Sequence, residues 1–209
     1  AKLALQRSQE LGYTLHEAIA QILMAQNFVT LADYYGDVPY SNAVQADEDV
    51  ILPTYDSQEA VYKGAIADFV AAAASISSNM GNLEAFGASQ DIFFGGDAEK
   101  WMKYANSLAL RYYMRLSEKD PSYAQAGVTA TLAKPLISSV DEECALAYIG
   151  TSDGTAQPSN SSTGGASAFN RVKPCTTFTD RLRELDDPRA SVWFAPVAIP
   201  IKVVAAADV

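Results

Sequence analysis

The sequence predicts a mainly α-helical protein with long irregular loops and little or no β-structure. Apolar residues recur every three or four positions in several long segments, which is the period of an amphipathic helix. Threonine or aspartate stands at the start of these segments, and glycine or proline follows most of them, as is typical of helix ends. Because 49% of the 209 residues are apolar, the chain can bury a substantial hydrophobic core.

The first long helix is expected to run from Thr14 to Tyr35. Thr14 and Glu17 have the spacing of a capping box, in which two side chains satisfy free N–H groups of the first turn. Gly36 favours a helix end at this point because glycine readily adopts a positive φ. The apolar positions, all expected on the buried face, are Leu15, Ile19, Ile22, Leu23, Phe28, Leu31 and Tyr35.

Two further long helices are expected after residue 55. Asp56 and Glu59 repeat the capping-box spacing, and the helix behind them contains four consecutive alanines, 71–74, which would let another helix approach closely. The next helix is expected to begin at Asp97. The apolar stripes of these helices comprise Tyr62, Ile66, Phe69, Ala73 and Ile76 in the first, and Trp101, Tyr104, Ala105, Leu108, Tyr112 and Leu116 in the second.

A fourth, shorter helix is expected between Asp120 and Pro135. Asp120 would cap this helix, and Pro121 would occupy its first position, where the missing N–H costs nothing. Residues 150–170 have no apolar period and many turn-forming residues, so we expect a loop there.

A last helix is expected from about Thr177 to Leu185, with Thr177 and Asp180 as its capping pair. The apolar segment 191–204 follows this helix. Pro196 and Pro200 interrupt that segment, so it can form at most an edge strand.

The net charge of the chain indicates which classes of binding partner are disfavoured. Fifteen basic and twenty-five acidic side chains give a formal net charge of −10, and the resulting field repels phosphate backbones and anionic lipid headgroups. We therefore expect no nucleic-acid partner.

No uninterrupted apolar run reaches the ~18 residues of a membrane-spanning helix, so we expect a soluble chain. The absence of an initiator methionine and of a signal sequence indicates a fragment of a longer protein.

The sequence contains none of the common nucleotide-binding, hydrolase or zinc-protease motifs. His16 is the only histidine, which leaves no second imidazole for a dyad or a metal site, and we expect a surface or interhelical position for it. Asp33 and Asp37 could form the carboxylate pair of a glycoside hydrolase. Acids at a helix end more commonly bond backbone groups, and we favour that role.

Two other groups of residues can carry chemistry. Asp47, Glu48 and Asp49 could bind calcium, but the EF-hand pattern is absent, so we favour a solvated acidic loop and expect no cofactor. Cys144 and Cys175 lack CxxC spacing. Two buried thiols are favoured over a disulfide, which would require an oxidising compartment.

Aromatic residues supply the candidates for ligand contact. Tyr40 and Trp193 fall in segments expected to be irregular, where an exposed ring can stack on a sugar, and Pro39 is expected to carry Tyr40 outward. Asn42 lies beside Tyr40 and is the third candidate.

Four segments resemble the SusD/RagB family of outer-membrane nutrient-binding lipoproteins, and in particular its SusD-like branch. The third is the most specific, because it combines a glycine–acid–x–x–lysine–tryptophan helix start with Asn-Ser-Leu and spaced arginines. The segments, which extend the resemblance from Gln26 to Phe194, are AQNFVTLADYYGDVPYSNAV, YDSQEAVYKGAIADFVAAAASI, DIFFGGDAEKWMKYANSLALRYYMRLS and FTDRLRELDDPRASVWF.

This resemblance implies tetratricopeptide-like helix pairs, with residues 1–209 part of a single SusD-like domain whose N-terminal lipoprotein segment and C-terminal region are missing. It implies a lipid-anchored protein on the cell surface at the outer membrane. Such a protein binds oligosaccharides, or peptides, delivers them to a SusC-like TonB-dependent transporter, and is not an enzyme. Alternatives are a helical glycoside hydrolase and an interaction scaffold. Ligand contacts vary within the family, so Tyr40, Asn42 and Trp193 stay our own candidates.

Overall fold

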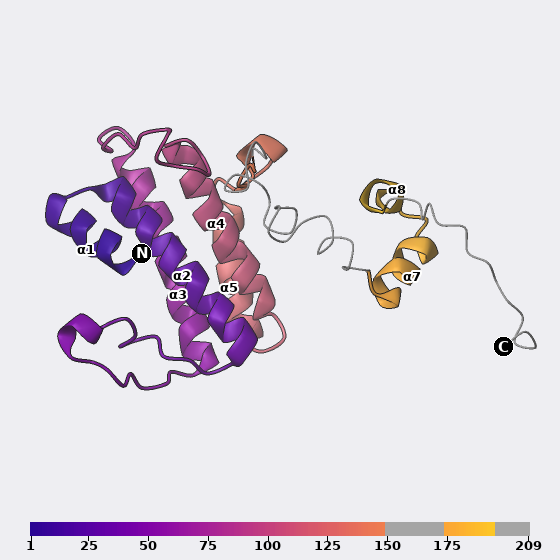
Figure 1. Ribbon diagram of the computed structural model, residues 1–209, viewed down its shortest axis with the longest axis horizontal. Coiled ribbons are helices and arrows are strands. Elements are labelled where there is room, and N and C mark those ends of the chain that lie inside the picture. The colour runs from indigo at the N-terminus through magenta and orange to yellow at the C-terminus, as the bar shows by residue number, and fades with distance from the viewer. Residues whose placement is uncertain (149–173, 195–209) are drawn as a thin grey trace, which may run out of the picture. The chain divides into compact units, whose positions relative to one another are not determined.

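The computed structural model describes residues 1–148 and 174–194 (Figure 1). These residues contain helices and one isolated antiparallel bridge, between Val38 and Asp56, and no strand. The prediction of a mainly α-helical fold is confirmed. The helices are α1 (Lys2–Leu11), α2 (Thr14–Tyr35), η1 (Ala46–Glu48), α3 (Gln58–Asn79), α4 (Ala98–Arg115), α5 (Pro121–Leu132), η2 (Val140–Glu142), α7 (Thr176–Glu184) and α8 (Arg189–Trp193).

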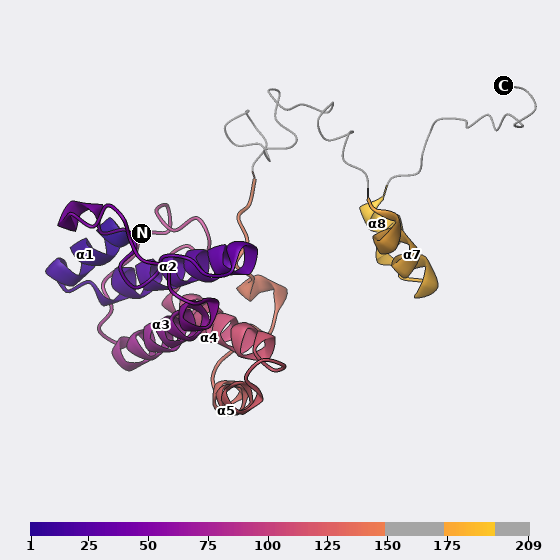
Figure 2. The same ribbon diagram turned by 90° about the horizontal axis from the view of Figure 1, so that it is seen from below.

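Residues 1–147 form one compact unit in which each helix packs on the next one along the chain. α1 and α2 are joined by a tight turn at Gly12, and Figure 2 shows α2, α3, α4 and α5 side by side. The start of α3 faces the end of α4, since Tyr62 and Arg115 line one cleft. α3 and α4 therefore run antiparallel, as in the helix pairs expected from the resemblance.

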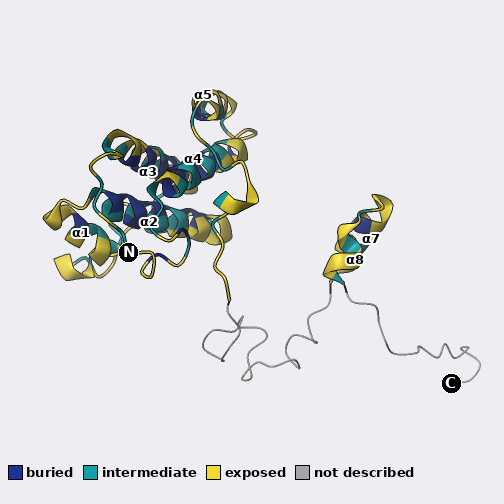
Figure 3. Cartoon of the chain, turned by 90° about the horizontal axis from the view of Figure 1, so that it is seen from above, coloured by how far each residue is buried: buried dark blue, intermediate teal, exposed yellow. Residues whose placement is uncertain are grey.

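The core lies where α2, α3 and α4 face one another (Figure 3). Ala72 and Ala73 of the alanine run are buried in this core, and the expectation that they let another helix approach closely stays a prediction. The largest fully buried side chains are Trp101, Phe69, Leu15, Ile22, Ile66, Ile76, Val29 and Val61.

One face of α2 differs from the prediction. Leu31 and Tyr35 were expected in the core, but their exposed fractions are 44% and 75%. The buried residues at this end of the helix are the small Ala25, Val29 and Ala32. Because α2 carries apolar residues on nearly all sides, the three- and four-residue spacing alone does not identify the buried side.

Two helix starts agree with the sequence and three do not. The Asp97 and Asp120 carboxylates accept N–H bonds from the first turns of α4 and α5, as predicted. The three predicted capping boxes are wrong. Thr14 already lies inside α2, Ser57 rather than Asp56 caps α3, and α7 begins at Thr176 without a side-chain cap.

The described residues of the second unit, 174–194, comprise α7 and α8. Trp193 lies at the end of α8 rather than in an irregular segment, so that expectation was wrong. Its ring stacks on Phe178 with centroids 5.9 Å apart. The loop predicted at 150–170 and most of the possible edge strand at 191–204 lie outside the described residues.

Among the described helices, α3 alone is long and apolar enough to cross a membrane by length and composition. It packs between α2 and α4, and its residues Val61, Ile66 and Phe69 are fully buried in their shared core. The apolar character of α3 is therefore explained by its position in the helix layer.

Candidate functional site

A groove of about 360 Å³ lies beside Tyr40, between α1, α2, α3 and the loop after α2. The Phe28 and Tyr40 rings meet edge to face in its wall, with centroids 5.1 Å apart. The remaining lining combines aliphatic and polar side chains. The full lining is Lys2, Leu5, Gln6, Met24, Phe28, Tyr40, Ser41, Ala43, Gln45 and Asp68.

The chain folds back after α2 and carries Tyr40 into this wall. Gly36 ends α2 with a φ of 76°, and Val38 then forms the antiparallel bridge with Asp56. The Asp56 carboxylate accepts the backbone N–H bonds of Tyr40, at 3.0 Å, and of Ser41, at 2.8 Å. These contacts fix the turn, and they lower the pKa of Asp56 below its usual range, with the bonds from Ser41 contributing most.

Tyr40 points inward, so the expectation that Pro39 carries it outward was wrong. Its hydroxyl donates to the Asp68 carboxylate of α3 at 3.1 Å. Gly64 provides room for the ring, since a Cβ at that position would lie 2.5 Å from it. Burial, and next the Asp68 charge, raise the pKa of Tyr40, so the phenol keeps its proton and remains a donor.

An ion-pair cluster closes the groove on the side of α1. The Lys2 ammonium contacts Asp47 at 2.6 Å and Glu48 at 3.2 Å, which joins α1 to η1. These acids belong to the run considered for calcium. In the described part of the chain, no group of three or more His, Cys, Asp or Glu side chains could hold a metal ion.

The groove continues along the exposed side of α2. A neighbouring hollow of about 230 Å³ shares Lys2, Met24 and Phe28 with it and extends to Leu31 and Val44. Its lining is mostly apolar. The side of α2 that includes Leu31, expected in the core, therefore forms part of a surface groove. No signal in the sequence distinguished this side of the helix from the buried one.

Asn42 is not among the residues that line the groove, and Trp193 belongs to the second unit. The Asn42 side-chain carbonyl accepts the Thr54 N–H at 3.2 Å, which ties together the loop between α2 and α3. Trp193 is 50% exposed, and the Arg189 guanidinium lies over its ring. The ligand-binding roles of Tyr40, Asn42 and Trp193 stay predictions. Sequence reasoning missed Gln6, Gln45 and Asp68, which lie on separate elements and share no motif.

Asp33 and Asp37 each have a structural partner. Asp33 pairs with the Arg115 guanidinium and accepts the Tyr62 hydroxyl, which joins α2, α3 and α4. Asp37 accepts the Gln58 N–H at the start of α3 at 2.9 Å. Asp37 therefore has the backbone-bonding role favoured for both acids, whereas Asp33 bonds side chains of two other helices instead.

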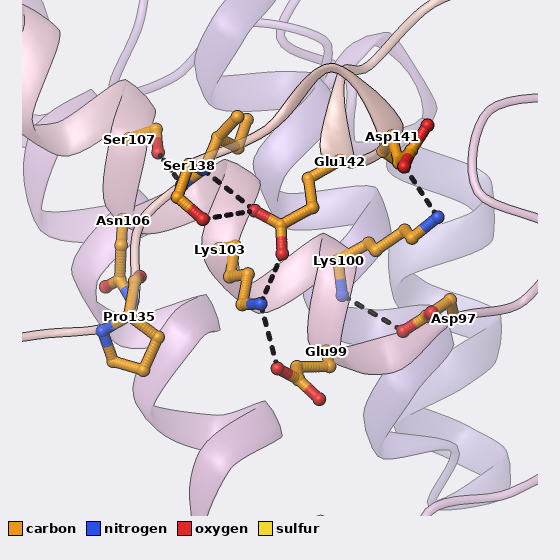
Figure 4. A network of polar contacts seen from close by, with 11 residues as sticks. Asp97, Glu99, Lys100, Lys103, Asn106, Ser107, Pro135, Ser138, Asp141 and Glu142 are labelled. Atoms are coloured by element: carbon orange, nitrogen blue, oxygen red, sulfur yellow. Dashed lines mark hydrogen bonds and ion pairs between the residues drawn. The ribbon is translucent and has the colours of Figure 1, made fainter.

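A second polar network fastens the segment after α5 to α4 (Figure 4). The Lys103 ammonium joins Glu142 with Glu99, and Lys100 donates to the Asp141 carbonyl at 2.7 Å. The hydrogen bond from the Lys103 ammonium, followed by N–H bonding from Ser138, lowers the pKa of Glu142 to about 2. The Lys100, Lys103 and Glu142 side chains all have partners within this network, so it serves attachment.

The lone histidine has a structural contact, and the two cysteines are unpaired with each other. His16 contacts the Glu84 carboxylate at 2.8 Å and lies beside the Phe86 ring, so it holds the loop after α3 against α2. Both thiols are free. Cys144 is half-buried, whereas Cys175 is exposed, which contradicts the expectation of two buried thiols.

Comparison with known proteins identifies the family. Residues 2–201 match the SusD-like family model described as "Starch-binding associating with outer membrane". The chain belongs to the SusD-like family. No match was found among curated proteins.

Solved structures agree with this assignment. The SusD-like chain is 30% identical to a SusD homologue from Bacteroides uniformis, with 71% of this chain and 30% of that one covered and a TM-score of 0.64. A Bacteroidetes SusD-like protein is 28% identical, and the match covers 90% of this chain and 36% of that one with a TM-score of 0.73. A chitin-binding protein is 30% identical, with 85% and 36% covered and a TM-score of 0.65. The SusD-like chain thus spans about a third of the length of these structures.

Proposed function

We propose that this protein is a cell-surface glycan-binding subunit that captures oligosaccharides and delivers them to a SusC-like TonB-dependent transporter of the outer membrane. The observation that carries the proposal is the groove beside Tyr40, in which two aromatic rings adjoin amide, hydroxyl and carboxylate groups. The proposed location is the outer membrane, with a lipid anchor outside the described chain.

The groove matches the chemistry of a sugar. A pyranose ring presents C–H groups on its faces, which pack on aromatic and aliphatic surface, and hydroxyls around its edge, which need hydrogen-bond partners. Phe28 and Tyr40 provide the first kind of surface, and Gln6, Gln45 and Asp68 provide the second. The apolar continuation over Leu31 and Val44 would hold further rings of a linear chain.

The family supports a binding role. Its description names starch binding and association with the outer membrane, and one similar solved structure is a chitin-binding protein. Neutral glycans of these two kinds are therefore the first ligands to test. A peptide ligand is the second candidate, since an extended backbone could bond the same amide and carboxylate groups.

Catalysis is not part of the proposal. Asp33 is held by Arg115 and Tyr62, and Asp37 by the start of α3, so neither carboxylate lines the groove. A hydrolytic site built on this pair would need both carboxylates free to act on one glycosidic bond.

Calorimetry with starch, chitin and peptide oligomers tests the function. Gln6→Ala combined with Gln45→Ala removes two amide groups from the groove and should weaken binding about tenfold or more. The matched control Gln125→Ala, on the exposed side of α5, should leave affinity unchanged. Absence of binding by every oligomer, or equal affinity of the double variant and the control, contradicts the proposal.

A further inference from the structure

Asp68 is the acidic side chain that lines the groove. Its two oxygens accept one hydrogen bond each from uncharged donors, the Tyr40 hydroxyl at 3.1 Å and the Gln21 amide at 2.9 Å. No ion pair involves Asp68 anywhere in residues 1–148. Because each carboxylate oxygen has a second lone pair, Asp68 can accept a further bond from a ligand.

The charges around Asp68 are mostly negative. Lys2 is the one cation in the lining, and its ammonium is already shared between Asp47 and Glu48. Asp56 lies behind the wall, where it accepts bonds from Tyr40 and Ser41. Asp47, Glu48 and Asp56 thus each bond a residue that lines the groove. A ligand carboxylate would be repelled by these acids and by Asp68.

The carboxylate lies beside the aromatic surface. The hydroxyl of Tyr40 bonds Asp68, so the acid is one hydrogen bond away from the edge of a ring that would support a sugar. A sugar stacked there can bring a substituent of its ring to the acid. An ammonium substituent would form the strongest bond to the Asp68 carboxylate, because a hydrogen bond between charged groups is about twice as strong as a neutral one.

We propose that Asp68 makes this groove prefer glycans with free, protonated amino groups over neutral glycans, and reject glycans with carboxylates. This rests on the proposed function and names the ligand class of the same site. A chain of glucosamine units provides the chemistry: C–H faces for Phe28 and Tyr40 and an ammonium group for Asp68.

The test compares tetramers that share length and differ in charge. Tetraglucosamine, its fully N-acetylated form and tetragalacturonate are titrated by calorimetry at a mildly acidic pH at which the amino groups carry protons. Tetralysine controls for charge without sugar rings. Asp68→Asn keeps the shape of the side chain, and Glu59→Gln, which removes an acid at the exposed start of the same helix, is the matched control.

Tetraglucosamine should bind about tenfold more tightly than its acetylated form, with tetragalacturonate and tetralysine much weaker. Asp68→Asn should abolish this preference, and Glu59→Gln should keep it. A preference that survives Asp68→Asn, or equally tight binding of tetragalacturonate or tetralysine, overturns the inference while glycan binding itself stands. Absence of binding by all three sugars contradicts the proposed function as well.

Discussion

Replacing Asp91 should destabilise the fold more than replacing any exposed acid. Its side chain is 4% exposed and accepts four bonds, from the N–H groups of Phe93, Phe94 and Gly96 and from the Trp101 indole. The two shortest, from Gly96 and Trp101, are both 2.8 Å. Together they hold the loop that leads into α4 against the core.

The expected magnitude follows from these donors. Asp91→Ala leaves the Gly96 and Trp101 N–H groups without partners, at about 1–3 kcal/mol each, so we expect a loss of about 2–6 kcal/mol in the free energy of unfolding. Asp91→Asn keeps one acceptor oxygen and should lose roughly 2–3 kcal/mol. Such losses are a large part of the 5–15 kcal/mol typical of a domain.

The stability conferred by Asp91 should depend on pH. Burial by itself raises the pKa of Asp91, but the bonds from Gly96 and Trp101 outweigh it and lower the pKa below the ordinary 3.8. A carboxyl with a lowered pKa in the folded state contributes stability above its unfolded pKa and loses it as pH falls through its folded pKa. The difference between the native protein and Asp91→Asn should therefore shrink below about pH 4.

Urea unfolding followed by far-UV circular dichroism measures both effects. Asp141→Asn is the control, because the Asp141 side chain is exposed and its backbone carbonyl, not its carboxylate, binds Lys100. A loss below about 1 kcal/mol for Asp91→Ala, or equal stabilities of Asp91→Asn and Asp141→Asn at neutral pH, would refute the reasoning.

Two further predictions concern the groove and the segment after α5. Gly64→Ala places a methyl group 2.5 Å from the Tyr40 ring. It should lower the free energy of unfolding by about 1–3 kcal/mol and weaken glycan binding. Gly81→Ala, with open space around the added methyl group, should do neither. Glu142 has a pKa lowered from 4.5 to about 2, so the attachment of residues 137–142 should hold above pH 4.5 and loosen toward pH 2. Amide hydrogen exchange of residues 137–142, measured by NMR, checks this loosening. Protection factors that stay unchanged between pH 4.5 and pH 2 would contradict the attachment through Glu142.

Local features of the fold could be predicted from the sequence. Asp97 and Asp120 cap their helices because an acid before the first turn bonds N–H groups only two or three residues away. Phe69 and Trp101 are buried, as expected from the three- and four-residue spacing of the apolar positions in their helices. Gly36 ends α2 because its backbone adopts a positive φ.

The groove could not be predicted, because its residues meet only after folding. Gln6, Gln45 and Asp68 come from α1, a loop and α3. The inward direction of Tyr40 depends on Asp56, sixteen residues away, and on the room beside Gly64. The sequence could name Tyr40 as a candidate, and the side chains that complete its surroundings required the packed helices.

A crystal structure of the protein with the most tightly bound glycan tests the central claim most directly. The account predicts a sugar ring on Phe28 and Tyr40, with ring substituents bonded to Asp68 and to Gln6 or Gln45, and further rings running toward Leu31. A glycan bound at Trp193 or at any other surface, with the groove beside Tyr40 empty, would contradict it.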